Sequence, residues 1–276
     1  MFEVYRFPAD YLPYWFLVMR TGLGAFKRFL RRCRTGGALR LLDIGCGGGG
    51  YSLYAACTGD EVTGLDLSHS NLCNLRRTED RLPDHPRIRW VAGDGYELPF
   101  GDNSFDVVLS SHVIEHLRNP RPMLDEIARV LRPGGTLYLQ CPSTHHNMRI
   151  CRWFGINLDP PEHIVEGYEV DDVTAILPDS LRMRRHGYQA RFVEANFLDL
   201  QMALARLTGL RAIPQKENAV DATQHGGSSV ILRLAYPFKE AVLLAVMALA
   251  WVEDRCLPFV PGCFSVFECE RVAQND

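Results

Sequence analysis

The feature that most constrains the fold is an apolar run that ends in a glycine-rich turn. Residues Leu39–Ile44 are mainly hydrophobic, and every position of the following Gly45–Gly50 segment except Cys46 is glycine. A continuous apolar run of this length is typical of a strand buried on both faces of a parallel sheet. Glycines directly after it let the backbone approach a ligand closely. The segment therefore predicts a strand that turns through a ligand-binding loop into a helix.

Strand and helix patterns alternate along the next hundred residues. We expect a helix over Gly50–Cys57 and another over Asn119–Leu131, with strands over Glu61–Leu67, Ile88–Ala92, Phe105–Ser110 and Thr136–Cys141. This alternation predicts an α/β fold with a parallel sheet and right-handed crossovers. After residue 142 the regular alternation of strand and helix patterns ends. There we expect a helix over Val170–Leu177 and strands over Arg191–Phe197 and Cys263–Val272.

Composition narrows the functional classes. The chain has 276 residues, of which 47% are hydrophobic, and a net charge of -3, so a strongly basic nucleic-acid surface is not expected. The nine cysteines form no CxxC pair, which favours reduced thiols and a cytoplasmic location. The start of the chain lacks a signal-peptide pattern. The longest apolar run, Ala241–Val252, is shorter than the roughly 20 residues that a membrane-spanning helix needs.

The acid at the end of the first strand indicates which ligand the glycine turn receives. Gly45, Gly47 and Gly50 satisfy the spacing of a dinucleotide-binding turn, and the helix behind them would offer free N–H groups. A carboxylate at Asp43 would repel a pyrophosphate but attract an ammonium group, directly or through water. The site therefore favours a ligand with a cationic amino-acid end, which S-adenosylmethionine has.

Several motifs in series carry a family resemblance. Asp43–Gly49 resembles the first motif of class I S-adenosylmethionine-dependent methyltransferases, and Asp66, Asp94, Glu115-His116 and Leu131–Leu137 follow in the family's order. This series of motifs is similar to the ubiquinone/menaquinone-biosynthesis-like branch of the family, the methyltransferase type 11 branch. It implies a Rossmann-like, mainly parallel seven-stranded sheet with helices on both faces, plus cap segments at the N-terminus and at 143–168. We expect one methyltransferase domain over 1–276, with a helical cap at 1–38, a cofactor-binding core at 39–142, and the acceptor-side lid and last strands at 143–276.

The resemblance implies the cofactor contacts residue by residue. Asp66 would hold the ribose hydroxyls and the Asp94 region the adenine amino group. The full set that we expect at S-adenosylmethionine is Asp43, Gly45, Cys46, Gly47, Asp66, Leu67, Asp94, Gly95, Ser111 and His116. Ubiquinone-type O-methyltransferases carry two acids and a histidine for a divalent metal in the 112–116 stretch, but His112 replaces the first acid here, so we expect no metal.

Methyl transfer needs no fixed triad, because the sulfonium already activates the methyl group and the protein mainly positions the reactants. A general base helps only where the acceptor carries a proton. The candidate bases are His163, in a Pro-Pro-flanked segment that resembles acceptor-contacting segments of relatives, together with His146 and His112.

The acceptor is predicted only by class. The aromatic N-terminal segment and the missing basic surface favour a small or lipid-like acceptor, methylated on oxygen or carbon. The basic stretch Lys27–Arg34 suggests peripheral membrane contact as a hypothesis, and Ala241–Val252 suggests a homodimer helix as another. Two alternatives remain open: a cofactor-binding cyclase or scaffold without methyl transfer, and a nicotinamide-dependent oxidoreductase.

Overall fold

The computed structural model describes residues 15–79, 88–145, 163–191 and 260–272, with scattered positions between 193 and 257. The chain divides into two compact units. One comprises residues 23–146, 159–189 and 259–276, and holds every strand of the sheet. The other comprises residues 1–22, 147–158 and 190–258. The assignment of the whole chain to a single methyltransferase domain stays a prediction.

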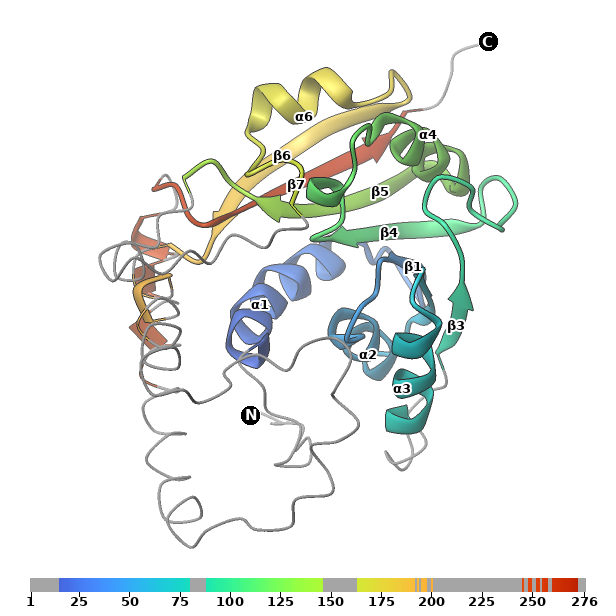
Figure 1. The fold of residues 1–276 in the computed structure, drawn as a ribbon, viewed down its shortest axis with the longest axis horizontal. Coiled ribbons are helices and arrows are strands. Elements are labelled where there is room, and N and C mark those ends of the chain that lie inside the picture. The colour runs from blue at the N-terminus through green and yellow to red at the C-terminus, as the bar shows by residue number, and fades with distance from the viewer. Residues whose placement is uncertain are drawn as a thin grey trace, which may run out of the picture. The chain divides into compact units, whose positions relative to one another are not determined.

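A seven-stranded sheet organises the larger unit, in the order β3-β2-β1-β4-β5-β7-β6 (Figure 1). The strands are β1 Arg40–Ile44, β2 Glu61–Asp66, β3 Arg89–Ala92, β4 Phe105–Ser111, β5 Leu131–Pro142, β6 Leu181–Gln189 and β7 Phe264–Arg271. Strands β1 to β5 pair in parallel, whereas β7 pairs antiparallel with both β5 and β6. The mainly parallel Rossmann-like sheet predicted from the sequence is confirmed.

Helices connect the strands as expected. They are α1 Trp15–Cys33, α2 Gly50–Cys57, α3 His69–Glu79, the short 3-10 helix η2 Ile114–His116, α4 Arg121–Val130 and α6 Val170–Ile176. The predicted bounds of α2 are matched, and α4 and α6 are each shorter than predicted. The Ser68 hydroxyl accepts a hydrogen bond from the Asn71 amide at the start of α3, as the side chain of an N-cap residue does.

Two strand predictions need correction. Residues 193 and 195–197 are helical, not part of a strand. The last position in the sheet is instead taken by β6, which lies at the edge of the sheet. An edge strand tolerates charged side chains, and β6 has four charged or imidazole side chains in nine residues, which conceal its strand pattern. The fifth strand also begins at Leu131 rather than Thr136, since Leu131 pairs with Phe105 across a register shift.

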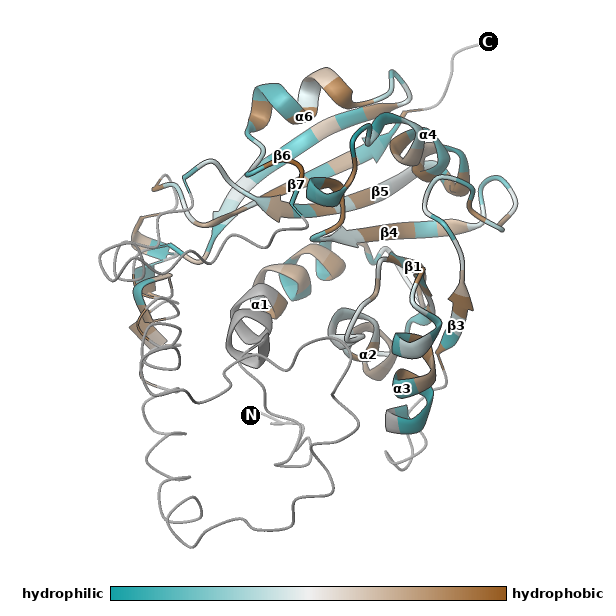
Figure 2. Cartoon of the chain, in the orientation of Figure 1, coloured by the Kyte–Doolittle hydropathy of each residue, from teal (hydrophilic) through white to brown (hydrophobic). Residues whose placement is uncertain are grey.

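The core follows the central strands. Strands β1 and β4 are buried along almost their whole length, and Leu124 and Ile127 of α4 belong to the same buried hydrophobic cluster as their side chains. Figure 2 shows hydrophilic colouring along β6, in keeping with its place at the edge. Because β1 and β4 are packed in the core, the positions of their carboxyl ends are fixed. Among the described residues, no helix is long and apolar enough to cross a bilayer.

Candidate functional site

Those predicted site residues that the structure describes lie around the carboxyl-terminal edge of the sheet, where the parallel strands end. The carboxyl ends of β1, β2 and β4 lie side by side, because Ile44 pairs with Leu65 on one side and with Ser110 on the other. The chain order of the strands reverses between β1 and β4, and open α/β sheets bind ligands at such a switch point. The loops after these strands therefore form the candidate site.

The glycine turn is anchored to β2 by its own backbone. The amides of Gly45 and Cys46 both donate to the Leu65 carbonyl, at 2.8 and 3.0 Å. The Gly47 amide donates to Asp66 Oδ2 at 2.8 Å. Gly45 has a φ of 67°, and a Cβ placed there would lie 2.5 Å from Val113 Cγ2. Only glycine fits this position, so the sequence constrains the turn to one shape.

Asp66 has a structural role that the sequence did not reveal. Its Oδ2 atom accepts from Gly47, and its Oδ1 atom accepts from the Ser68 amide at 2.8 Å. Each carboxylate oxygen has two lone pairs, so both oxygens retain one for a further donor. The neighbouring Leu67 is 76% exposed, which leaves an apolar surface at the same edge.

Asp43 is buried beneath the glycine turn. Its Oδ2 atom accepts from the Ser52 hydroxyl at 2.5 Å, and Cys46 is buried nearby in the chain. Burial raises the pKa of Asp43 from 3.8 to about 7, although the Ser52 hydrogen bond lowers it and the charge of Asp66 adds to the rise. A cation at this place would favour the ionised form.

The raised pKa of Asp43 predicts a pH-dependent cost in stability. Between about pH 4 and 7 the folded chain retains a proton that the unfolded chain loses, so this residue's contribution to stability falls as the pH rises through that window. We expect Asp43→Asn, which keeps an acceptor for Ser52, to change the free energy of unfolding relative to the native chain. The change should be about 1–3 kcal/mol more stabilising at pH 8 than at pH 5. Urea unfolding of both proteins at the two pH values measures this difference. An equal effect at both would refute the raised pKa.

The loop after β3 carries the next predicted acid. Asp94 is exposed, and its Oδ1 atom accepts from the Tyr96 amide at 2.9 Å in a tight turn. Gly93 donates to the Asp66 carbonyl at 3.2 Å, which ties this loop to the end of β2. A Cβ at Gly95 would lie 3.1 Å from Met123 Sδ. The turn places Asp94 and Gly95 at the edge that carries Asp66.

A buried amide lies at the ends of β4 and β5, and sequence reasoning missed it. Gln140 Oε1 accepts from Tyr51 Oη at 2.8 Å and from Ser111 Oγ at 3.2 Å. Gln140 Nε2 donates to Gln189 Oε1 at 3.3 Å. The sequence does contain a signal for this residue, because a glutamine within an apolar strand must find buried hydrogen-bond partners. The network fixes the hydroxyl of Ser111, one of the predicted cofactor residues.

The turn after β4 presents a histidine and a buried acid. His112 has a φ of 57°, a left-handed conformation that is uncommon outside glycine. Its Nδ1 atom lies 3.0 Å from Glu115 Oε1, and the Glu115 side chain is fully buried. Its ring also packs edge-on against Phe264, with 4.8 Å between ring centroids. His112 therefore orients Glu115, and the ring of His112 is largely enclosed.

The segment 163–168 returns to the same turn. The amides of Ile164 and Val165 donate to the Glu115 carbonyl at 2.8 and 3.2 Å. Tyr168 donates its amide to the Pro142 carbonyl at 2.9 Å and its hydroxyl to the Ile114 carbonyl at 3.2 Å. These bonds hold residues 163–168, hereafter the strap, against η2.

The strap brings two predicted residues together. The His163 ring contacts the His116 ring edge-on, with 4.8 Å between ring centroids. Both rings are partly buried. The third predicted base, His146, lies outside the described residues.

The same contact assembles a group that could bind a metal. One ligand atom each from Glu115, His116 and His163 lies within 4.8 Å of the other two. The sequence predicted no metal, because His112 replaces an acid of the metal-binding stretch in ubiquinone-type enzymes. Local sequence also could not place the strap histidine beside η2. The set is two imidazoles and one carboxylate, which is a recognised ligand combination for zinc and for non-haem iron.

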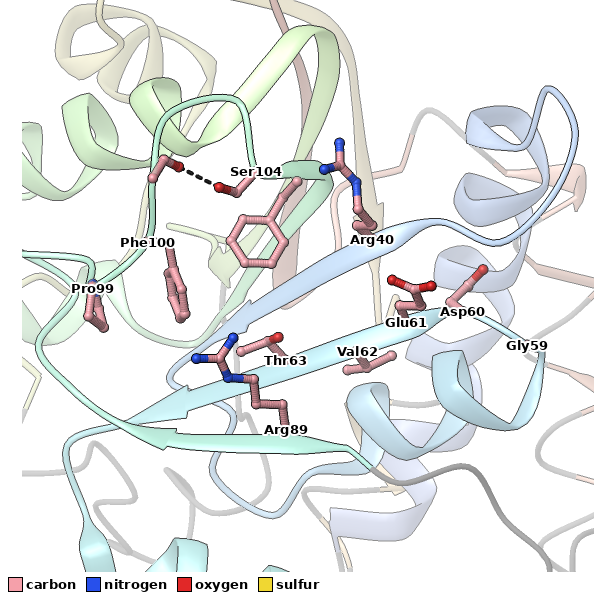
Figure 3. Close-up of a pocket in the computed structure, with 12 residues that line it drawn as sticks. Arg40, Gly59, Asp60, Glu61, Val62, Thr63, Arg89, Pro99, Phe100 and Ser104 are labelled. Atoms are coloured by element: carbon pink, nitrogen blue, oxygen red, sulfur yellow. Dashed lines mark hydrogen bonds between the residues drawn. The ribbon is translucent and has the colours of Figure 1, made fainter.

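A separate hollow of about 690 Å³ lies at the opposite edge of the sheet (Figure 3). It is lined by residues at the amino ends of β1, β2 and β3, including Arg40, Glu61 and Arg89. Phe100 and Phe105 pack edge-on at its wall. None of the predicted cofactor residues lines it. The hollow is therefore distinct from the carboxyl-edge site.

Comparison with known proteins agrees with this geometry. Residues 42–139 match the family model described as a methyltransferase domain. The match covers about a third of the chain. Its bounds fall within the 39–142 core predicted from the sequence, so the recognition of the family is confirmed.

Similarity to curated relatives is confined to part of each chain. The chain is 39% identical over 100 residues to the demethylmenaquinone methyltransferase of Clavibacter sepedonicus, covering 36% of this chain and 40% of that one. It is 38% identical over 122 residues to the phthiotriol/phenolphthiotriol dimycocerosates methyltransferase of Mycobacterium tuberculosis, covering 42% of each. The matched regions thus span less than half of these relatives' length.

A solved structure supports the fold. The S-adenosylmethionine-dependent methyltransferase of Methanosarcina mazei aligns with a TM-score of 0.50 and 22% identity, covering 59% of this chain and 88% of that one. At this identity the likeness concerns the fold alone.

Proposed function

We propose that this protein transfers a methyl group from S-adenosylmethionine to a small or lipid-like acceptor. The observation that carries the proposal is the set of acids around the glycine turn, Asp43, Asp66 and Asp94, which lie at or just after the carboxyl ends of three neighbouring parallel strands. The methyltransferase domain matched over residues 42–139 supports the same reaction class.

The side chains at this edge suit the chemistry of that cofactor. Asp43 offers a negative charge for the ammonium end, directly or through water, whereas it would repel the pyrophosphate of a nicotinamide dinucleotide. Asp66 retains lone pairs for two ribose hydroxyls. Asp94 is exposed to accept from the adenine amino group, and the exposed Leu67, next to Asp66 in the chain, offers an apolar surface. Gly45, Cys46, Gly47 and Gly95 would shape the cradle.

The reaction needs positioning more than it needs activation. When bound, the cofactor supplies a methyl group on a positively charged sulfur. The protein must hold the acceptor atom about 3–3.5 Å from the methyl carbon, in line with the breaking bond, and keep water out. Ser111, whose proton is directed to Gln140, and His116 are the proposed cofactor contacts on the β4 side.

His163 is our leading candidate for the group that takes the acceptor's proton, because the strap holds it at the carboxyl edge beside His116. We expect His163→Ala to lower turnover about 10²–10⁴-fold for a protonated acceptor. Its affinity for S-adenosylmethionine should stay within about twofold, because the cofactor acids are intact. Steady-state kinetics and calorimetry measure the two quantities separately.

The control for this variant is His145→Ala, which removes an exposed histidine outside the His116 contact. Turnover of His163→Ala equal to that of the control would exclude His163 as the base. The role would then fall to His112 or to His146.

Acceptor class is the remaining part of the proposal. Two relatives are named for demethylmenaquinone and for phthiotriol/phenolphthiotriol dimycocerosates, which supports a lipid-like acceptor. Two others are named as an O-methyltransferase and a C-methyltransferase, which supports oxygen or carbon as the target. Release of S-adenosylhomocysteine, measured with a panel of quinols and lipid alcohols, tests it. Release with none of them, despite tight cofactor binding, would favour the cyclase or scaffold alternative.

Contact with a membrane surface and formation of a homodimer are two further proposals. Vesicle sedimentation tests the first, and light scattering tests the second.

A further inference from the structure

We propose that Glu115, His116 and His163 together bind a divalent transition-metal ion. The proposal does not depend on methyl transfer, because it rests on the side chains of η2 and the strap. One ligand atom of each residue lies within 4.8 Å of the others. In a tetrahedral zinc site, with metal–ligand distances of about 2.0–2.2 Å, neighbouring ligand atoms lie roughly 3.5 Å apart. Modest rotations of the two imidazole rings would close this difference.

The carboxylate of Glu115 is the observation that points to a ligand. Its side chain is fully buried, and its Oε1 atom is engaged by His112 at 3.0 Å. Its Oε2 atom, also buried, has no hydrogen-bond partner among the described residues. A buried carboxylate oxygen without a partner is costly, since its desolvation is not offset. A cation at Oε2 would supply the missing interaction.

His112 has the place of an orienting group rather than a ligand. Histidine–carboxylate contacts behind a metal ligand hold that ligand in one orientation and affect its affinity for the metal. Because Glu115 Oε1 is committed to His112, Oε2 is the oxygen left for the metal. The proposed ligands are therefore not the three neighbouring residues 112, 115 and 116 of the turn after β4. The third ligand, His163, comes from the strap.

The ligand types define the class of ion. Imidazole nitrogen favours Zn²⁺, Co²⁺ and Fe²⁺, whereas Mg²⁺ and Ca²⁺ prefer oxygen ligands throughout. Three protein ligands leave a coordination position open, as in catalytic zinc sites. An imidazole that coordinates through one nitrogen and is protonated at the other cannot also accept a proton. With the metal bound, His163 would be a ligand and not a base.

Cobalt is the best probe, because its visible absorption reports the ligands directly. Purified full-length protein, freed of metals, is titrated with Co²⁺ in the absence of cofactor and acceptor. We expect visible d–d bands that saturate at one Co²⁺ per chain, without the near-ultraviolet charge-transfer band that a thiolate ligand gives. This last feature matters because the chain has nine cysteines.

Variants assign the bands to the cluster. We expect His163→Ala and His116→Ala to weaken Co²⁺ binding by more than about 100-fold, and His112→Ala to weaken it about 10–100-fold, as loss of an orienting group does. His145→Ala, an exposed histidine outside the cluster, should bind as the native chain does. Circular dichroism verifies that each variant is folded. Because His163 lies on a connecting segment, its variant keeps the test valid if substitutions in η2 unfold the chain.

Three results would overturn the proposal. One is the absence of saturable Co²⁺ binding at millimolar metal. Another is a thiolate charge-transfer band, which would assign the ion to cysteine. The third is equal affinity of folded His163→Ala and His145→Ala.

Discussion

Replacing Gly45 with alanine should destabilise the fold and weaken cofactor binding together. The added Cβ would lie 2.5 Å from Val113 Cγ2, closer than non-bonded carbons approach. The φ of 67° adds a left-handed backbone cost of about 1–2 kcal/mol for a residue with a Cβ. Overpacking adds about 1–3 kcal/mol, so we expect a loss of about 2–5 kcal/mol in the free energy of unfolding. Urea denaturation measures it.

The effect on ligand binding follows from the anchoring of the turn. Gly45 and Cys46 bond to Leu65, and Gly47 bonds to Asp66, so relief of the clash with Val113 would displace the cradle itself. A displacement that costs only about 1.4 kcal/mol of binding free energy weakens binding tenfold. Calorimetry with S-adenosylhomocysteine should show at least that loss.

Gly48 provides the matched control within the same turn. A Cβ at Gly48 would meet no heavy atom within 4 Å, and its φ lies outside the left-handed region. Gly48→Ala should therefore leave the free energy of unfolding within about 0.5 kcal/mol of the native value, as surface substitutions usually do. Equal losses in the two variants would argue against the shape that the structure assigns to the turn.

Replacing Gly167 with alanine should detach the strap. A Cβ there would lie 2.4 Å from the Ser143 carbonyl carbon and 2.7 Å from the Thr144 nitrogen, and main-chain atoms cannot rotate away. Relief requires the strap to move from the end of β5, which would break the bond from the Tyr168 amide to Pro142. We expect a loss of about 1–3 kcal/mol in stability.

The functional signature of Gly167→Ala separates the strap from the cradle. His163 would lose its contact with His116, whereas the glycine turn and Asp66 would be unaffected. Turnover should fall while affinity for S-adenosylhomocysteine stays unchanged. The control is Gly187→Ala in β6, where a Cβ meets no heavy atom within 4 Å. A loss of cofactor affinity in Gly167→Ala, with turnover preserved, would contradict the role given to the strap.

The core of the fold was predictable because its signals are local. The buried strands β1 and β4 are apolar runs, and the positions of Asp43, Asp66 and Asp94 follow from where such runs end. Glycine at position 45 is likewise required by the turn itself. For these residues, local sequence and the rule that ligands bind at the carboxyl ends of parallel strands were sufficient.

Long-range contacts explain what the sequence did not predict. Nothing near His163 in the chain indicates that its ring contacts His116, because that contact depends on the Glu115 carbonyl accepting two strap amides. The Tyr51–Gln140–Ser111 network joins three separate elements in the same way. β6 was missed because an edge strand tolerates charges that conceal its pattern.

Calorimetric titration with S-adenosylhomocysteine tests the central claim, that the carboxyl edge around the glycine turn is a cofactor site. The native chain should bind one equivalent, and Asp66→Ala should bind it about 1–3 kcal/mol more weakly, since the variant loses the acceptor for the ribose and for the Gly47 amide. Asp102→Ala, at an exposed surface carboxylate, should bind as the native chain does. Undiminished binding by Asp66→Ala, or binding of NAD⁺ in place of S-adenosylhomocysteine, would contradict the account.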